Sequence, residues 1–428
     1  NVLGEYDAEL LAQFDELRED VIVASNTRNN DTAEAASVAA AGLEKASDLL
    51  DNSSLKDATM LSRAFTVYFH LANLCEENYR VAVLKNREWE VDTRSATDPV
   101  NELTVAYKRL IDEVGVAGAN ELLEKLEFHP VFTAHPTEAR RKAVEGKIRR
   151  IATFLDERDR TGGSERAEID RRLHSEIDSL FRTSPIGLKK PTPVEEADTV
   201  INVFDTTLFS VIPNVYRRFD DWILGSKAGT VPPVCPAFFH PGSWVGSDRD
   251  GNPNVTAKVS RQVARKYYDH MVTKLAEATR KTATRLTVES ATTPPSDEMK
   301  ALWSRQKEMS ERLTSRADII STSEPHRAAM LVMADRLEAT VERDADLMYV
   351  SADDFLADLR VIQRSLAEAG AVRIAYGDIQ ALIWRVETFG FHMVEMEFRQ
   401  HSLVHSRALE DIREHGLHGE RGPLQPMT

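Results

Sequence analysis

The sequence predicts a predominantly α-helical α/β fold in which a few parallel strands alternate with long helical segments. Over most of the chain, apolar residues recur at steps of three and four, which is the period of a helix. Only three segments have the pattern of strands, and about 100 to 150 mostly helical residues separate each from the next. We expect parallel strands joined by crossovers, because a hairpin needs a short turn.

The composition is that of a globular protein. The chain has 428 residues, of which 42% are hydrophobic and 29% charged, and this excludes the disordered and fibrous classes. The length predicts two or three domains or one elaborated barrel. The formal net charge of −15 argues against nucleic acid and anionic membrane surfaces as partners, because both require a basic face. No apolar run reaches the length of a membrane span.

The cysteines and the N-terminus bear on the cellular compartment. Cys75 and Cys235 lie far apart without CxxC spacing. We therefore expect neither a disulfide framework nor a thiolate metal site, and a reducing cytoplasm is the natural location. Residues 1–5 do not resemble a secretory signal, and the missing initiator Met indicates a piece of a longer chain.

Helices are expected over most of the chain. Residues 43–98 contain neither Gly nor Pro, and apolar residues within them predict a buried stripe on a long amphipathic helix: Leu61, Ala64, Phe65, Tyr68, Leu71, Ala72, Cys75 and Tyr79. Pro213 should kink or break the helix predicted at 194–224. The remaining helices are predicted at roughly 6–25, 33–51, 101–126, 138–158, 164–182, 257–287, 297–315, 324–343, 353–369 and 376–388.

Three strands are expected, at about 130–134, 237–240 and 391–398. The third shows period-two alternation, so that Glu395, Glu397 and Arg399 share one face. Each strand is followed by residues that could carry chemistry. In a parallel barrel the carboxyl ends of the strands form the active face.

His135 follows the first strand, and Pro136 and a helical pattern come after it. A histidine at this corner lies beside the free N–H groups that begin a helix, where an anionic substrate is stabilised. Its imidazole can move a proton near neutral pH or bind a phosphate oxygen. The alternative is a histidine that only fills a turn. The basic residues 140–142 fit a solvated or ion-paired surface better than a site.

The second candidate is the glycine-rich loop Gly242–Thr256. Glycines let backbone approach a ligand closely, and Asp-Gly-Asn-Pro is typical of a turn. Asp248 and Arg249 could instead form a structural ion-pair cluster with Asp250, and Trp244 could belong to the core. Both interpretations stay open. A calcium loop is disfavoured, because the remaining ligand positions are missing.

The third candidate is Arg399, at the end of the third strand. An arginine there can grip a phosphate with two hydrogen bonds. The alternative is a salt bridge with Glu397 that lines a barrel interior. The two are compatible, because a carboxylate can orient the arginine that binds the phosphate.

These segments resemble the signatures of phosphoenolpyruvate carboxylase. Thr133 to Lys142 fits the family pattern TAHPT-(E or Q)-x-x-R followed by a basic residue. Gly242–Thr256 is similar to GSWMGGDRDGNP, and the segment from Phe389 to Gln400 resembles the FG…IRQ run. Weaker matches lie at 63–65, 71–74 and 190–193, so the resemblance covers about residues 60 to 405.

The resemblance implies a carboxylase, a carbon–carbon lyase. Bicarbonate attacks the phosphorus of phosphoenolpyruvate, and the resulting carboxyphosphate releases carbon dioxide, which the enolate captures to form oxaloacetate. His135 would be the catalytic histidine and Arg399 a phosphate-binding arginine. Trp244, Asp248 and Arg249 would help to bind substrate in a pocket that excludes water. The cofactor would be Mg²⁺ or Mn²⁺, and the assembly a homo-oligomer, a tetramer, with feedback by four-carbon acids.

The resemblance also refines the fold. It implies the N-terminal part of a (β/α)8 TIM-like barrel with large helical insertions, with about three of eight strands present. We divide the chain into an N-terminal helical region, 1–128, and the first part of the barrel, 129–428. Family members are about twice as long, and the metal ligands, the catalytic lysine and a second glycine-rich loop are expected in the other half. The alternative hypothesis is a non-catalytic helical half-module that needs a partner to complete the barrel.

The chain departs from the family pattern at four places. Ser247 replaces the second glycine of a GG pair, and its cost depends on whether that position needs a positive φ. Gly187 and Asp198 stand near positions where the family has arginine, and His401 replaces a glutamate. We expect these changes to affect local salt bridges more than the chemistry.

Overall fold

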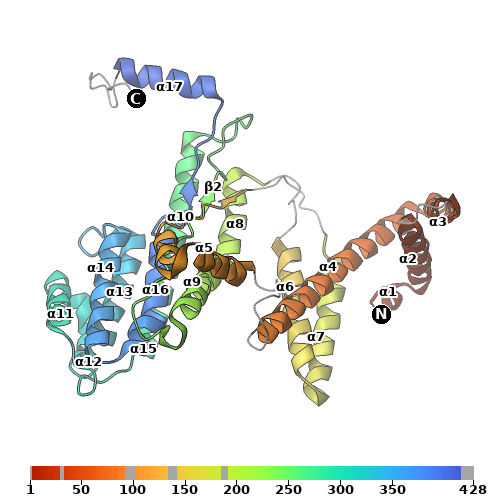
Figure 1. The fold of residues 1–428 in the computed structure, drawn as a ribbon. Coiled ribbons are helices and arrows are strands. Elements are labelled where there is room, and N and C mark those ends of the chain that lie inside the picture. Colours follow the sequence, from red (N-terminus) through yellow and green to blue (C-terminus); the bar gives the residue numbers. More distant parts are fainter. Residues whose placement is uncertain (1, 29–32, 92–101, 134–141, 185–190, 416–428) are drawn as a thin grey trace. The chain divides into compact units, whose positions relative to one another are not determined.

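The chain forms two compact units in this computed structural model. The structure describes residues 2–28, 33–91, 102–133, 142–184 and 191–415 (Figure 1). One unit contains residues 1–105 and 137–190, and the other contains residues 106–136 and 191–428.

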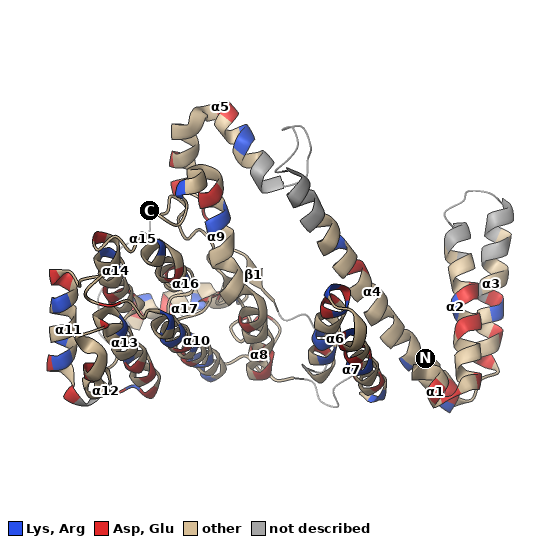
Figure 2. Ribbon diagram, turned by 90° about the horizontal axis from the view of Figure 1, so that it is seen from below, with Lys and Arg blue, Asp and Glu red and all other residues tan. Residues whose placement is uncertain are grey.

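Among the described residues of the first unit, helices are the only regular elements. Its helices are α1 (Val2–Tyr6), α2 (Ala8–Arg28), α3 (Ala33–Asp51), α4 (Leu55–Val91), α6 (Lys142–Arg160) and α7 (Gly163–Arg182). Their shared core contains Leu61 of α4, Ile151 of α6 and Phe181 of α7. Figure 2 shows basic and acidic residues together along α6 and α7. Between these helices Arg150 pairs with Glu176, with 2.6 Å between Nη2 and Oε1. That pairing lowers the pKa of the Glu176 carboxyl group.

The predicted stripe on residues 43–98 is only partly correct. A break at residues 52–54 separates α3 from α4. Leu61 and Ala64 are buried, but Ala72, Cys75 and Tyr79 are exposed. The reason is that α4 is 37 residues long, and the core it shares with α2, α6 and α7 reaches no further along it than Leu74.

The limits of the units differ from the predicted regions 1–128 and 129–428. Helices α6 and α7 pack with the N-terminal helices, because their apolar faces share a core with α2 and α4. Helix α5 (Glu102–Glu124) lies mostly in the second unit. The assignment of residues 129–428 to a barrel stays a prediction.

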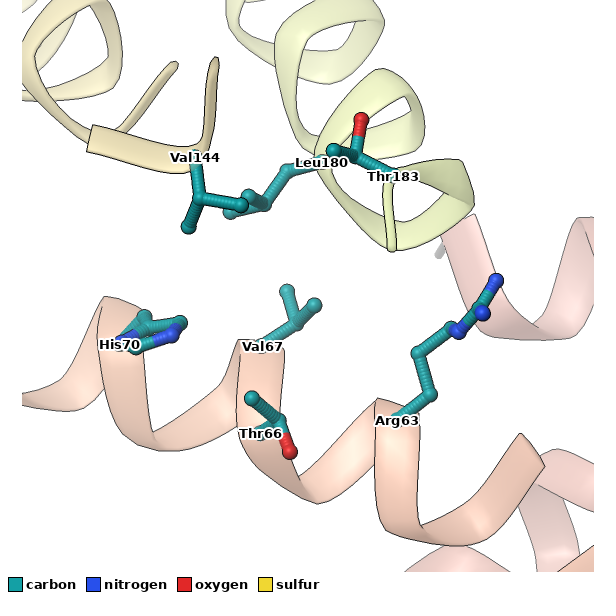
Figure 3. A pocket seen from close by; sticks show the side chains of 7 residues that line it. All are labelled: Arg63, Thr66, Val67, His70, Val144, Leu180 and Thr183. Carbon is teal, nitrogen blue, oxygen red and sulfur yellow. The ribbon is translucent and has the colours of Figure 1, made fainter. Parts of the chain in front are cut away.

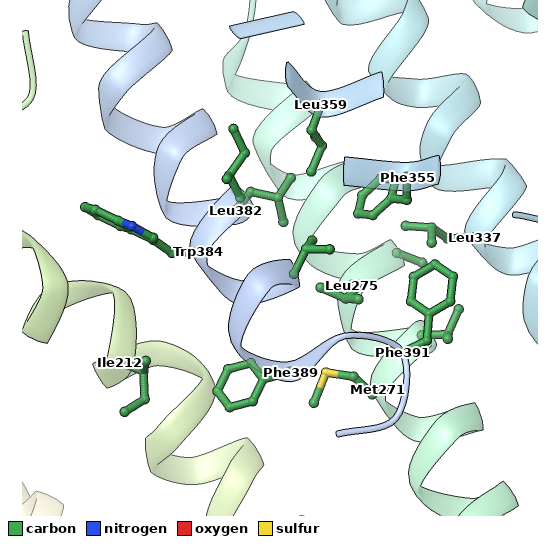
Figure 4. Packing of buried hydrophobic residues seen from close by; sticks show 14 of the residues in the cluster. Ile212, Met271, Leu275, Leu337, Phe355, Leu359, Leu382, Trp384, Phe389 and Phe391 are labelled. Atoms are coloured by element: carbon green, nitrogen blue, oxygen red, sulfur yellow. The ribbon is translucent and has the colours of Figure 1, made fainter. Parts of the chain in front are cut away.

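The second unit surrounds a large apolar core. Its helices are α8 (Pro193–Val203), α9 (Phe209–Leu224), α10 (Ala257–Arg285), α11 (Asp297–Met309), α12 (Glu311–Ser321), α13 (Pro325–Glu342), α14 (Ala352–Glu368), α15 (Val372–Ile374), α16 (Gln380–Phe389) and α17 (Ser402–His415). Figure 4 shows Phe389 and Phe391, at the end of α16, near Met271 and Leu275 of α10. This packing fixes the turn that leads into the third strand.

The strands form one parallel sheet in the order β1 (Val131–Phe132), β2 (Gly242–Ser243), β3 (Glu395–Met396). In register, Phe132 lies opposite Ser243, which lies opposite Met396. The prediction of three parallel strands with helical crossovers is confirmed. All three carboxyl ends therefore meet at one edge of the sheet.

Two strand predictions need correction. Residues 237–240 are not the sheet strand: Phe239 makes only an isolated bridge with Phe128, and regular pairing begins at Gly242. Backbone hydrogen bonds still join the two segments, from Phe128 N–H to Phe238 O at 2.7 Å and from His240 N–H to Phe128 O at 2.8 Å. Pro130 lacks the N–H group that would donate the next one.

The third strand is also shorter than the predicted 391–398. Met393 has a φ of 68° and its N–H group bonds to the carbonyl oxygen of Phe389, so residues 391–394 form a turn. Met393 and Val394 are both buried, which ends the predicted alternation.

The helix predicted at 194–224 is divided, but not at Pro213. A π-helical turn, η1 (Phe204–Leu208), separates α8 from α9, and Pro213 lies inside α9. Proline cannot donate to the carbonyl oxygen four residues earlier, that of Phe209. Arg385 Nε takes its place and donates to that oxygen at 2.8 Å. A side chain from α16 thus satisfies the acceptor that Pro213 leaves free.

Two further helix predictions changed, and one helix was not predicted. The helix at 297–315 divides at Ser310, whose hydroxyl group caps α12 by accepting the N–H of Leu313. The helix at 376–388 begins with a second π-helical turn, η3 (Ala375–Ile379), which follows α15. Helix α17 was not predicted, and none of its residues is buried.

Candidate active site

Beyond β2 and β3 the backbone ladder continues into the glycine-rich loop. Four hydrogen bonds form it: Glu395 N–H to Pro241 O at 2.8 Å, Glu397 N–H to Ser243 O at 3.0 Å, Arg399 N–H to Ser247 O at 3.3 Å, and Arg249 N–H to Arg399 O at 2.9 Å. Between Ser243 and Ser247 the chain loops out, and the N–H groups of Ser247 and Asp248 both donate to the carbonyl oxygen of Trp244, at 3.0 and 2.9 Å. This loop places Trp244 at the carboxyl edge.

Gly246 is the residue that makes the loop possible. It has a φ of +77°, and a Cβ atom there would lie 2.5 Å from Cγ2 of Val263 on α10. Ser247 has no positive φ. The substitution at 247 therefore carries no backbone strain, and its hydroxyl group donates to the carbonyl oxygen of Glu397 at 2.7 Å.

Arg399 and Trp244 lie together at this edge. The guanidinium carbon of Arg399 is 5.7 Å from the centroid of the Trp244 ring. Glu397 Oε2 accepts from Arg399 Nε at 2.8 Å and from Nη2 at 2.5 Å. The side chain of Arg399 is still 46% exposed, so it is open to a ligand. The salt-bridge interpretation and the anion-binding interpretation thus remain compatible.

Arg249 and Asp248 join the same edge through different contacts. The guanidinium of Arg249 lies 5.9 Å from the ring centroid of Phe398, and its Nε is buried without a hydrogen-bond partner. Asp248 Oδ1 accepts the N–H of Asp250 at 3.0 Å, which closes a turn. Within the residues that the structure describes, Arg249 forms no ion pair with either aspartate, so the alternative interpretation, a structural ion-pair cluster, is not seen there.

His135 lies outside the described residues, as do Arg140 and Arg141. The described chain reaches Thr133. Just before it, the carbonyl oxygen of Phe132 accepts a hydrogen bond from Ser243 Oγ at 2.9 Å. The described part of this segment thus ends, at Thr133, at the same edge of the sheet as Trp244 and Arg399. Its catalytic role stays a prediction.

The other departures have local partners where they are described. Asp198 pairs with Lys266 of α10, with 2.6 Å between its Oδ1 and Nζ. His401 Nδ1 accepts the N–H of Leu403 at 3.3 Å and so caps α17. Gly187 lies outside the described residues.

Sequence reasoning missed the two serines that fix this edge. Ser243 and Ser247 are fully buried, and each donates its hydroxyl hydrogen to the backbone of a neighbouring segment. Sequence reasoning singled out Ser247 only as a departure from the family pattern and did not mark Ser243, because serine in a glycine-rich loop is ordinary turn composition.

The described residues do not fit a resident metal ion. Mg²⁺ prefers several oxygen ligands, but among these residues no group of three or more His, Cys, Asp or Glu is placed to hold a metal. Glu397 is engaged by Arg399, and Asp248 by its own turn.

None of the helices in the described part of the chain has both the length and the apolar character that a membrane span requires.

The first unit contains a small pocket between α4, α6 and α7 (Figure 3). It is lined by Arg63, Thr66, Val67, His70, Val144, Leu180 and Thr183. Its volume of about 10 Å³ is that of one water at most. Arg63 Nη1 donates to the carbonyl oxygen of Phe181 at 3.4 Å. The weaker sequence match at residues 63–65 thus belongs to the packing of this unit.

Comparisons with known proteins agree with the motifs. A family model described as phosphoenolpyruvate carboxylase matches residues 11–420. A protein of that name from Roseiflexus castenholzii is 33% identical over 380 residues, 84% of this chain and 39% of that protein. One from Azorhizobium caulinodans is 30% identical over 390 residues, which cover 87% of this chain and 40% of that protein. One from Nostoc sp. is 30% identical over an alignment of 432 residues, which covers 85% of this chain and 41% of that protein. The chain spans about 40% of the length of these curated relatives.

Proposed function

Because the chain belongs to the phosphoenolpyruvate carboxylase family, we propose that it supplies the phosphate-binding part of an enzyme that carboxylates phosphoenolpyruvate with bicarbonate. The products are oxaloacetate and phosphate, and the intermediates are carboxyphosphate and the enolate of pyruvate. The chain covers only about 40% of its relatives, so we propose this activity for an assembly that also contains the remaining part.

One observation carries the proposal: Arg399, held by Glu397, lies beside Trp244 at the edge where all three strands end. A guanidinium group held in this way suits a phosphate, because its donors match the spacing of two phosphate oxygens. The indole of Trp244 adds an apolar wall. Such a wall helps to exclude water, and water would protonate the enolate and release it as pyruvate.

In this proposal His135 manages the proton at the carboxyphosphate step. Imidazole can hold or release a proton near neutral pH, which suits a group that must act on a bicarbonate-derived acid. Arg249 and Asp248 shape the loop around the same substrate. The family resemblance also implies Mg²⁺ or Mn²⁺, whose Lewis acidity would stabilise the enolate. Since the described residues do not fit a metal site, the ligands of such an ion would come from the remaining part of the enzyme.

The remaining features of the whole enzyme are also proposals. We propose that β1, β2 and β3 are the first strands of a (β/α)8 barrel whose other strands come from the remaining part. We also propose that the whole enzyme is a homo-oligomer, a tetramer by resemblance, and that it is located in the cytoplasm.

Complementation tests the function. Oxaloacetate formation from phosphoenolpyruvate and bicarbonate, with Mg²⁺, is measured for the chain alone and for the chain mixed with the C-terminal part of the Roseiflexus castenholzii relative. We expect activity in the mixture only. If no mixture forms oxaloacetate and the chain does not bind phosphoenolpyruvate, the chain is a non-catalytic module instead.

Replacing Arg399 by Ala tests the phosphate role within the active mixture. We expect mainly a higher KM for phosphoenolpyruvate, because Arg399 contacts the phosphate in both the ground and the transition state. Arg343→Ala is the control, since Arg343 pairs with Asp269 of α10 and not with a residue of this edge. An unchanged KM in the Arg399→Ala variant would refute the phosphate role.

A further inference from the structure

We infer that Glu397 is a positioning residue, which selects the edge of the Arg399 guanidinium that binds the substrate anion. This inference rests on the proposed function, because it takes Arg399 as the anion ligand. It adds a second residue with a separate role and a separate test.

The geometry of the pair defines the edge. A guanidinium group has five N–H donors. Oε2 of Glu397 accepts one from Nε, at 2.8 Å, and one from Nη2, at 2.5 Å. Among the described residues, nothing accepts a hydrogen bond from Nη1. The end of the group, formed by Nη1 and the outer hydrogen of Nη2, is therefore left for a ligand, and it can bind two oxygens of one anion.

Glu397 is itself held at both ends. Its N–H donates to Ser243 O at 3.0 Å and its carbonyl oxygen accepts from Ser247 Oγ at 2.7 Å. Its other carboxylate oxygen lies over Gly242, where a Cβ atom would come within 3.7 Å of it. The backbone that carries the carboxylate is thus fixed to the sheet, and the carboxylate in turn orients Arg399.

Trp244 fixes the guanidinium from another direction. Its ring centroid is 5.7 Å from Cζ of Arg399. A guanidinium group held by a carboxylate and an indole loses less rotamer freedom when a ligand binds. The anion therefore meets donors that are already in place.

This role makes a prediction opposite to that of simple electrostatics. A carboxylate beside an arginine repels an incoming anion, so its removal should strengthen anion binding if only charge mattered. If Glu397 positions Arg399, its removal should weaken binding, because Arg399 becomes free to rotate. The sign of the change in anion affinity therefore separates a positioning role of Glu397 from a purely electrostatic one.

The test uses the 428-residue chain and two probes, inorganic phosphate and phosphoenolpyruvate. Binding is followed by phosphorus NMR titration at low ionic strength, and thermal unfolding confirms that each variant is folded. We expect Glu397→Ala to weaken binding of both probes about tenfold and Glu397→Gln to weaken it less, since the amide oxygen still accepts hydrogen bonds. Glu395→Ala is the matched control. It removes a charge from the same strand, but its carboxylate faces His129, at 3.7 Å from Nδ1, and not Arg399. We expect it to bind as wild type or slightly more tightly.

The outcomes separate the two proposals. If Glu397→Ala binds as tightly as wild type while Arg399→Ala does not bind, only the positioning role is overturned. If Arg399→Ala binds as wild type, the anion-binding role of Arg399 fails, and both proposals fall with it. Failure of the wild-type chain to bind either probe also overturns the positioning role, since a guanidinium held in place should bind on its own.

Discussion

Ser247 donates its hydroxyl hydrogen to the backbone carbonyl oxygen of Glu397, with 2.7 Å between the two oxygen atoms. Both groups lie where the glycine-rich loop meets the chain that leads to Arg399. Ser243 makes the equivalent bond on the other side, to the carbonyl oxygen of Phe132. Two buried hydroxyl groups thus join the three strand ends that form the candidate site.

Replacing Ser247 by Ala should destabilise the second unit by about 1–3 kcal/mol, because a buried carbonyl oxygen loses its donor. Urea unfolding followed by tryptophan fluorescence measures this, since four of the five tryptophans lie in this unit: Trp222, Trp244, Trp303 and Trp384. Ser304→Ala is the control, because the exposed hydroxyl of Ser304 bonds only within its own helix. Equal unfolding midpoints for Ser247→Ala and wild type would contradict the account.

Replacing Gly246 by Ala should cost about 2–4 kcal/mol in unfolding free energy. The new Cβ atom combines a positive φ with a clash against Val263. Gly251→Ala separates the two causes, since Gly251 has a φ of +66° but nothing within 4 Å of its Cβ position. We expect about 1 kcal/mol there. The same urea experiment applies, and equal costs at both glycines would show that Val263 does not constrain the loop.

His326 should make the stability of the second unit depend on pH. It is fully buried, its Nε2 is 2.8 Å from Ser365 Oγ, and its Nδ1 has no partner. Burial lowers the pKa of His326 from 6.5 to about 4, so the folded protein holds it neutral. The unfolded chain binds the extra proton as the pH falls below its ordinary pKa. The unfolding free energy should therefore decrease between about pH 6.5 and pH 4, by about 3 kcal/mol from this group.

The comparison of His326→Gln with wild type isolates this effect. We expect a flatter dependence of unfolding free energy on pH in the variant, and an unchanged dependence in His405→Gln, where an exposed histidine is removed. Parallel curves for His326→Gln and wild type would remove His326 as the cause.

The sequence predicted the meeting of Trp244 and Arg399 because parallel strands place their carboxyl ends at one edge. It also predicted most helix ends, which depend on local periodicity and caps. It did not predict that α6 and α7 pack with the N-terminal helices, because the choice of a packing partner is not contained in the period of one helix.

Long-range compensation explains the remaining differences. The proline rule pointed to a break at Pro213, but Arg385 of α16 satisfies the free carbonyl oxygen of Phe209. Similarly, Ser247 reads as a loop residue, and its role appears only when Glu397 lies beside it. Contacts of this kind join residues far apart in the chain, so local patterns cannot reveal them.

The most direct test of the central claim is the rate of oxaloacetate formation after His135→Asn, measured in the complemented mixture. His129→Asn is the matched control: His129 also flanks β1, but it precedes the strand and stacks on His240, with 4.8 Å between the ring centroids, at the opposite edge. We predict that His135→Asn abolishes oxaloacetate formation while His129→Asn retains it. Oxaloacetate formation at the wild-type rate by His135→Asn would contradict the catalytic role and, with it, the proposed site.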